Sequence, residues 1–111
     1  LRVVHTWEVP PIGAITGEPT FSPPELLADI KGNEMRTTAE VLASHRDRYP
    51  DVRVVQDVQR GSPVQVLTEL SEHSALVVVG SRGRGGFVGL LLGSVSHGVV
   101  HHAHCPVAVV H

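Results

Sequence analysis

A chain of 111 residues, 41% of them hydrophobic and 18% charged, is long enough for one folded domain and too apolar for a disordered segment. Its net charge of −2 gives no electrostatic reason to expect a nucleic-acid partner. Because Cys105 is the single cysteine, no internal disulfide can form, and a reducing cytoplasm is the expected compartment. The sequence has no apolar run long enough to span a membrane and no recognisable signal peptide.

The first half of the chain predicts a strand, a loop and a long helix. The strand is expected over Leu1–Trp7, and the proline-rich stretch Glu8–Pro24 is typical of a loop. Ser22-Pro23-Pro24-Glu25 then combines an N-cap serine, early prolines and the glutamate of a capping box. The helix that it opens is expected to run to about Arg48, and Gly32-Asn33 weakens its middle and marks a place for a kink.

The second half predicts alternating strands and helices. Val52–Val58 alternates apolar and polar residues, which favours an edge strand. Gly61-Ser62-Pro63-Val64-Gln65 then repeats the capping pattern, a cap serine followed by proline, and opens a helix that is expected to run to about Ser74. Leu76–Val79 is apolar on both faces and therefore predicts a strand buried on both sides. The last helix is expected over Ser94–Ala103, with its first serine as N-cap, and the last strand over Val107–Val110.

This order of strand, helix, strand, helix, strand, helix, strand predicts the α/β class. Alternation at this spacing implies right-handed crossovers and an open parallel sheet between two layers of helices, a three-layer sandwich. In such sheets ligands bind outside the carboxyl ends of the strands, at the point where the strand order reverses. Gly80 follows directly after the most apolar strand and therefore lies at such an end.

The stretch that carries the clearest chemistry is the loop between this strand and the last helix. It holds six glycines from Gly80 to Gly93, and a helix N-terminus follows it. Glycines allow the backbone to approach an anion, and the N–H groups of a first helical turn attract phosphate. We expect Gly80 and Gly83 beneath a ribose or the first phosphates, and Gly93, Ser94 and Ser96 around the outer phosphates.

Two common phosphate-binding motifs do not match this loop. A P-loop requires Gly-Lys-Ser/Thr, and the loop has no lysine. The dinucleotide fingerprint requires Gly-x-Gly-x-x-Gly, but Val88 stands where the last glycine of Gly83-Arg84-Gly85 would be needed. An ordinary structural loop followed by a helix cap remains the alternative to a phosphate site.

The spacing Gly80-x-x-Gly83, nine residues, then Gly93-Ser94 resembles the Gly-x2-Gly-x9-Gly-Ser/Thr signature of the ATP-binding branch of the universal stress protein family. The flanking sequence also resembles sequences of that family. It reads Val-Val-Val-Gly-Ser-Arg-Gly-Arg-Gly-Gly before the helix and His-His-Ala-His-Cys-Pro-Val-Ala-Val-Val after it. The resemblance covers the whole chain, although no family motif matches the loop from Ile12 to Thr20.

The resemblance implies a five-stranded sheet in the order 3-2-1-4-5. The four predicted strands match the second to the fifth strands of that family. We therefore expect a single domain over residues 1–111 that lacks the family's central first strand and its helix. The family's first strand ends in an aspartate that contacts the adenine side of the nucleotide, and this sequence has no counterpart of it.

The resemblance also suggests further nucleotide contacts. Thr6, at the end of the first strand, lies where the family places an adenine contact, and Val79 and Val95 are expected to contact the nucleotide through their backbones. Arg82 and Arg84 are candidates for phosphate pairing or for solvated positions in the loop.

The histidines near the C-terminus suggest a metal site at first sight. His97 and His101 have the i, i+4 spacing of zinc-binding helices, but Gly98 stands where a metalloprotease has its catalytic glutamate. A His-His pair is ordinary in the resembling sequences, so we expect no metal. Cys105 precedes Pro106 at a strand entrance and is expected to be a buried, inert thiol.

These observations lead to three hypotheses. The first is an ATP-binding stress or regulatory protein in which ATP, with or without Mg²⁺, sets conformation or partner choice and is hydrolysed slowly at most. The second is an interaction module whose glycine loop is structural. In both, the resemblance implies a homodimer through Val107–Val110. The third is an enzyme that acts on a small substrate at the same switch point, although no residue is nominated as catalytic.

Overall fold

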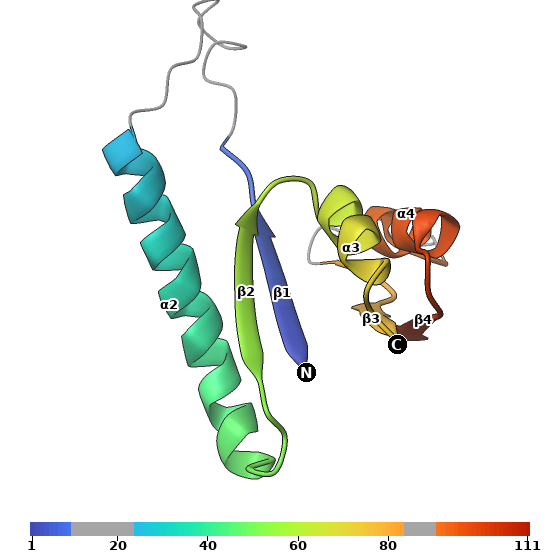
Figure 1. The fold of residues 1–111 in the computed structure, drawn as a ribbon, viewed down its shortest axis with the longest axis horizontal. Helices are drawn as coiled ribbons and strands as arrows, with labels where there is room; N and C mark the ends of the chain where they lie inside the picture. Colours follow the sequence, from blue (N-terminus) through green and yellow to red (C-terminus); the bar gives the residue numbers. More distant parts are fainter. Residues whose placement is uncertain (10–23, 84–90) are drawn as a thin grey trace, which may run out of the picture. The chain divides into compact units, whose positions relative to one another are not determined.

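The computed structural model describes residues 1–9, 24–83 and 91–111, and divides the chain into two units, Leu1–Gly61 and Ser62–His111. Each unit contains one pair of parallel strands and at least one helix (Figure 1). The α/β class and the parallel pairing are therefore confirmed. In the described residues the strands form two sheets of two strands each. Within the same residues, no helix is both long enough and apolar enough to cross a bilayer.

The first unit is a parallel pair of strands covered by a long helix. Strand β1 (Arg2–Trp7) pairs with β2 (Val55–Arg60) from Arg2↔Val55 to Trp7↔Arg60. Helix α2 (Pro24–Arg48) runs alongside the strands (Figure 1). Its residue Leu42 is buried, as are Trp7 and Val58 on the two strands. These apolar side chains form the core of the unit because burying apolar surface is the main stabilising term in folding.

Polar contacts fix the position of α2 on this pair. The imidazole Nε2 of His5 lies 2.6 Å from the carboxylate of Glu34, and the side-chain amide of Gln56 donates to the Met35 carbonyl oxygen at 2.6 Å. Helix α2 continues without interruption through Gly32, where the sequence marked a place for a kink. Gly32 is exposed, and no neighbouring atom lies within 4 Å of the position that a Cβ atom would take.

The second unit packs two helices against the other pair of strands. Strand β3 (Val77–Gly80) pairs with β4 (Val107–Val110), from Val77↔Val107 to Gly80↔Val110. Helix α3 (Pro63–Ser71) begins after the N-cap Ser62, as predicted, with proline in its first turn. Helix α4 (Ser94–His102) contributes the most buried side chain of this unit, Val99, which is 0% exposed.

The two helices of the second unit approach each other closely at Gly98. A Cβ atom added there would lie 2.8 and 2.9 Å from the two methyl carbons of Val64. Such distances are shorter than van der Waals contact. Any residue larger than glycine at position 98 would therefore force Val64 or α3 to shift. The close approach explains a glycine inside a helix, where it otherwise costs stability.

Two predicted boundaries were wrong. The strand predicted over Val52–Val58 begins at Val55, because the Val52 N–H donates to the Tyr49 carbonyl (3.2 Å) and continues the turn after α2. The helix predicted to reach about Ser74 ends at Ser71. There the backbone changes to i→i−3 hydrogen bonds, such as that from the His73 N–H to the Leu70 carbonyl at 3.2 Å.

The prediction that Leu76–Val79 is buried on both faces was also wrong. Val77 is buried, but Val78 is 56% exposed and Leu76 52%. Side chains alternate between the faces of a strand, so Val78 and the similarly exposed Val110 share the face opposite Val77. That face is apolar without being covered in the described residues.

We predict opposite effects of alanine at two helical glycines. Gly98→Ala is expected to lower the free energy of unfolding by about 1–3 kcal/mol, because the new methyl group overpacks against the stiff, β-branched Val64. The matched control Gly32→Ala, whose new methyl group meets nothing within 4 Å, is expected to raise it by about 0.5–1 kcal/mol. Urea unfolding followed by circular dichroism measures both. Equal stabilisation by the two substitutions would contradict the close packing of α3 on α4.

Candidate functional site

The two described ends of the glycine-rich loop close on each other at the carboxyl end of β3 and β4. The Ser81 N–H donates to the Val110 carbonyl at 2.8 Å, which extends the parallel pairing by one step beyond Gly80. The Ser81 carbonyl in turn accepts the N–H of Gly93 at 2.6 Å. The start of α4 is therefore tied directly to the end of β3. Residues 84–90, including Arg84, lie outside the described part of the chain.

Gly93 lies in the tightest position of this loop. A Cβ atom added there would be 3.2 Å from the Arg82 Cα and 3.4 Å from both the Gly83 nitrogen and the Ser81 carbonyl oxygen. The crowding comes from backbone atoms, which cannot move aside as a flexible side chain can. A side chain at position 93 would therefore require the backbone around Arg82 to move by a few tenths of an ångström, and glycine avoids that movement.

Gly93, and not Ser94 as predicted, is the N-cap of α4. Its backbone is extended (φ −72°, ψ 169°), and its carbonyl accepts the His97 N–H at 2.9 Å. Ser94 is the first helical residue and is exposed. No side chain of the described residues caps this end, so the N–H groups of the first turn keep their capacity to donate to an external acceptor.

Ser96 lies in the first turn of the same helix and braces the loop from inside. It is 1% exposed, and its hydroxyl oxygen lies 3.0 Å from the Ser81 carbonyl and 3.1 Å from the Gly93 carbonyl, either of which can accept its proton. The side chain therefore joins both sides of the loop closure.

Gly80 and Gly83 have no comparable steric reason to be glycine. A Cβ atom at Gly80 would meet the Arg82 carbonyl at an ordinary 3.6 Å, and one at Gly83 would meet nothing within 4 Å. Both residues are exposed, and among the described residues only Gly61 has a positive φ, at 145°. The described protein atoms therefore leave these two positions open on the solvent side.

The remaining predicted contacts divide between the two units. Val79 is half-buried in β3, Val95 is half-buried in α4, and Arg82 is exposed in the loop, all within the second unit. Thr6 belongs to β1 of the first unit, where it is half-buried opposite Gln59. The loop residues and the start of α4 are thus brought together, and Thr6 stays a prediction.

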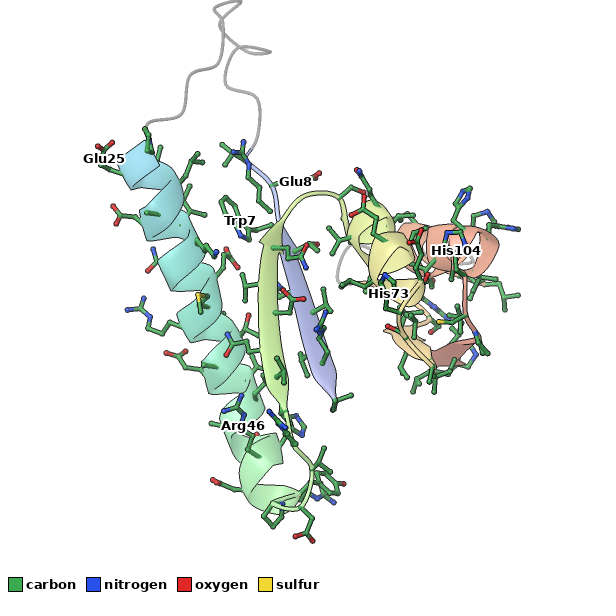
Figure 2. All side chains as sticks on the ribbon, viewed as in Figure 1. Trp7, Glu8, Glu25, Arg46, His73 and His104 are labelled. Atoms are coloured by element: carbon green, nitrogen blue, oxygen red, sulfur yellow. The ribbon has the colours of Figure 1, made fainter. Side chains whose placement is uncertain are left out.

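Sequence reasoning missed a feature beside Thr6. Trp7 is only 8% exposed, and its indole N–H is buried without a hydrogen-bond partner among the described residues. Figure 2 shows the ring between β1 and α2, and the Arg60 guanidinium carbon lies 5.9 Å from its centroid. No sequence pattern marks an unpaired donor, because pairing depends on the packed neighbours.

The histidines do not form a metal centre within residues 1–9, 24–83 and 91–111. No group of three histidine, cysteine or acidic side chains comes together there. The rings of His97 and His101 meet edge to face with centroids 4.4 Å apart, and His104 lies 3.7 Å from the Glu72 carboxylate. Cys105 is half-buried and not buried as predicted, and its sulfur lies 3.4 Å from the Pro106 carbonyl oxygen.

Comparisons with known proteins agree on one family. The family described as "Universal stress protein family" matches residues 1–111. A universal stress protein of Mycolicibacterium smegmatis is 43% identical over 114 residues, covering 99% of this chain and 35% of the relative. Universal stress protein Rv2005c of Mycobacterium tuberculosis is 41% identical over 109 residues, covering 98% and 35%. The chain therefore spans about a third of the length of these relatives.

Solved structures support the same fold. A hypothetical protein, MJ0577, superposes with a TM-score of 0.72 at 20% identity, over 98% of this chain and 73% of its own. A universal stress protein in complex with cAMP superposes with a TM-score of 0.54 at 24% identity, over 99% of this chain and 71% of its own. At these identities the likeness concerns the fold.

We predict that the hydrogen bonds of the Ser96 hydroxyl to the loop carbonyls contribute measurably to the free energy of unfolding. Ser96→Ala removes the hydroxyl that joins both sides of the closure and is expected to lower the free energy of unfolding by about 0.5–1.5 kcal/mol. The control Ser94→Ala removes an exposed hydroxyl from the same helical turn and is expected to change the free energy of unfolding by less than about 0.5 kcal/mol. Thermal unfolding of the two variants beside the parent measures the difference, and equal values would exclude the brace.

Proposed function

Because the chain belongs to the universal stress protein family, we propose that it is a nucleotide-responsive regulatory protein that binds ATP at the loop between β3 and α4. The observation that carries the proposal is the Gly-x2-Gly-x9-Gly-Ser spacing of Gly80, Gly83 and Gly93-Ser94 on a loop that ends at an uncapped helix N-terminus. Membership of this family favours a role in stress resistance and a cytoplasmic location.

The geometry of the loop supports phosphate binding in two ways. The closure at Gly93 holds the first turn of α4 beside the end of β3, so its free N–H groups and the helix dipole act at a fixed place. The open sides of Gly80 and Gly83 leave room for a ligand to contact backbone atoms directly. The exposed guanidinium of Arg82 is available to pair with a phosphate.

The choice of ATP rests on the motif. One structurally similar universal stress protein was solved with cAMP, which is also an adenine nucleotide. In this proposal the ribose and inner phosphates are contacted by Val79, Gly80, Arg82 and Gly83. The outer phosphates are contacted by Gly93, Ser94, Val95 and Ser96. Ser96 would act through its backbone N–H, because its hydroxyl is occupied by the loop carbonyls. Thr6 is proposed as an adenine contact, and Mg²⁺ would neutralise the phosphates.

A regulatory ligand fits the residues of the loop better than a fast ATPase does. The sequence from Gly80 to Ser96 contains no aspartate, glutamate or histidine that could activate a water molecule. We therefore propose that bound ATP sets conformation or partner choice and is hydrolysed slowly at most.

We propose that the two strand pairs belong to one three-layer sandwich with strand order 3-2-1-4-5. Each of β1 and β3 uses one edge for its partner, β2 or β4, and keeps the other edge without a strand in the described residues. A central strand that pairs with both free edges, and that is not part of this sequence, would complete the sheet. Its helix would cover the exposed apolar face of Val78 and Val110.

A dimeric interaction module is the alternative function, and the free edge of β4 favours it. The carbonyls of Pro106 and Val110 accept N–H groups from the β3 side, so by alternation Val107 and Val109 direct their backbone groups to the opposite edge. A second copy could pair there. Such a homodimer is compatible with the ATP-binding proposal, so bound nucleotide, and not dimerisation, separates the two functions.

We predict that Gly83→Val abolishes ATP binding while the fold is kept. The new side chain meets no described atom within 4 Å, so stability is expected to stay within about 0.5 kcal/mol of the parent. The affinity for ATP is expected to fall at least about tenfold, because the side chain blocks the approach of the ligand to the backbone. Isothermal titration with ATP and Mg²⁺ measures the affinity, and Gly32→Ala, on α2, is the control that keeps the loop intact. Equal affinity of parent and Gly83→Val would contradict the loop as the site.

The proposed dimer edge is tested with proline at two neighbouring positions. Val109→Pro removes an N–H from the free edge of β4 and is expected to give a folded monomer in sedimentation velocity. Ala108→Pro removes an N–H that serves the β3 ladder and is expected to destabilise the unit itself. A Val109→Pro protein that remains dimeric would place the dimer interface elsewhere.

A further inference from the structure

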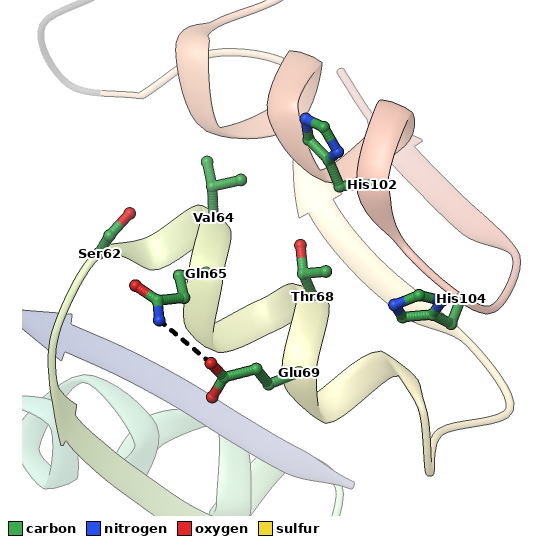
Figure 3. A pocket seen from close by; sticks show the side chains of 7 residues that line it. All are labelled: Ser62, Val64, Gln65, Thr68, Glu69, His102 and His104. Carbon is green, nitrogen blue, oxygen red and sulfur yellow. Dashed lines mark hydrogen bonds between the residues drawn. The ribbon is translucent and has the colours of Figure 1, made fainter.

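A hollow lies along α3 on the second unit, between this helix and the end of α4 (Figure 3). It has a volume of about 490 Å³, within the range of small-molecule sites. Helix α3 and its N-cap supply most of the wall, and the end of α4 and the segment after it supply the rest. The hollow, called the α3–α4 groove below, is lined by Ser62, Val64, Gln65, Thr68, Glu69, His102 and His104.

Contacts outside the groove hold its two walls in place. Val64 packs against Gly98, which fixes the separation of α3 and α4. The buried hydroxyl of Ser71 accepts the backbone N–H of His104 at 2.9 Å and donates to the Thr68 carbonyl. The segment after α4 is therefore tied to the end of α3. A groove with fixed walls can bind a ligand with little loss of conformational entropy on binding.

The strongest sign of a missing partner is the hydroxyl of Thr68. Its oxygen is buried and has no hydrogen-bond partner among the described residues. The helical threonines Thr37 and Thr38 behave differently, since their hydroxyls donate to carbonyls four residues earlier. Figure 3 shows the Thr68 hydroxyl on the side of α3 that faces α4. A buried hydroxyl without a partner costs about 1–3 kcal/mol, so a polar group in the groove would stabilise it.

The charge of the groove selects the kind of ligand. With histidines neutral, Glu69 is the single charged residue of its lining, and the Gln65 amide donates to this carboxylate at 3.2 Å. The imidazoles of His102 and His104 add nitrogen acceptors, and Val64 adds an apolar wall. A carboxylate with neighbouring acceptors favours a cation with N–H donors and repels an anion. The absence of a three-ligand metal group in the described residues favours an organic cation over a metal ion.

We propose that the α3–α4 groove binds a small alkylammonium compound. Its ammonium N–H groups donate to the Glu69 carboxylate, while a second polar group forms a hydrogen bond with the Thr68 hydroxyl. Its hydrocarbon part lies on Val64. This site shares no residue with the glycine loop and does not depend on ATP binding.

The test is titration of the whole chain with 1,4-diaminobutane at neutral pH, followed by calorimetry. We expect saturable binding by the parent, at least about tenfold weaker binding by Glu69→Gln, and unchanged binding by Glu40→Gln. The control makes the same charge change on an exposed residue of α2. No saturable binding by the parent up to about 10 mM, or equal loss in both variants, would overturn the proposal.

A second variant separates a ligand partner from a trapped water molecule. Thr68→Val keeps the shape of the side chain and removes the unpaired hydroxyl, so it is expected to raise the melting temperature and to weaken 1,4-diaminobutane binding. Unchanged affinity in Thr68→Val would show that water alone serves the hydroxyl, and the proposal would be rejected.

Discussion

The hydrogen bond from the Gly93 N–H to the Ser81 carbonyl is the contact on which the proposed nucleotide site depends. It brings the start of α4 to the end of β3 so closely that a side chain at position 93 would press on the backbone of Arg82. Ser96 stabilises the same closure, because its hydroxyl lies within hydrogen-bond distance of the Ser81 and Gly93 carbonyls. The free N–H groups of α4 can act on a phosphate only because this contact holds them there.

The three motif glycines are therefore not equivalent. The protein's own backbone crowds position 93, whereas a Cβ atom at Gly80 would make only an ordinary contact and one at Gly83 would meet no described atom within 4 Å. A glycine without a steric role in its own fold lowers stability through the entropy of the unfolded chain. Close approach of a ligand is a physical reason to keep one there, and this difference links the spacing in the sequence to the proposed function.

Much of the fold could be predicted because its local signals agree. Pro106 marks the start of β4, and the proline after Ser62 marks the start of α3, so both starts were predicted correctly. A boundary set by a turn hydrogen bond was missed at Val55, because the Val52 N–H donates to the Tyr49 carbonyl and continues the preceding turn. The N-cap was assigned to Ser94 because serine is a preferred cap, whereas the carbonyl of Gly93 makes the first helical bond.

Features that depend on packed neighbours could not be predicted from the sequence. The continuous apolar run Leu76–Val79 predicts Val78 as a core residue, but its exposure depends on what covers that face of the sheet. The unpaired groups of Trp7 and Thr68 and the close contact of Gly98 with Val64 likewise arise only once the elements are packed. The candidate loop was found from its spacing, whereas the α3–α4 groove has no sequence signature.

The most direct test of the central claim is to denature the purified protein and separate the released small molecules by ion-exchange chromatography against adenine nucleotide standards. The account predicts ATP or ADP in roughly equimolar ratio to the protein, or a rise in melting temperature when ATP and Mg²⁺ are added to nucleotide-free protein. Neither released nucleotide nor such a rise would contradict ATP binding and favour the interaction module.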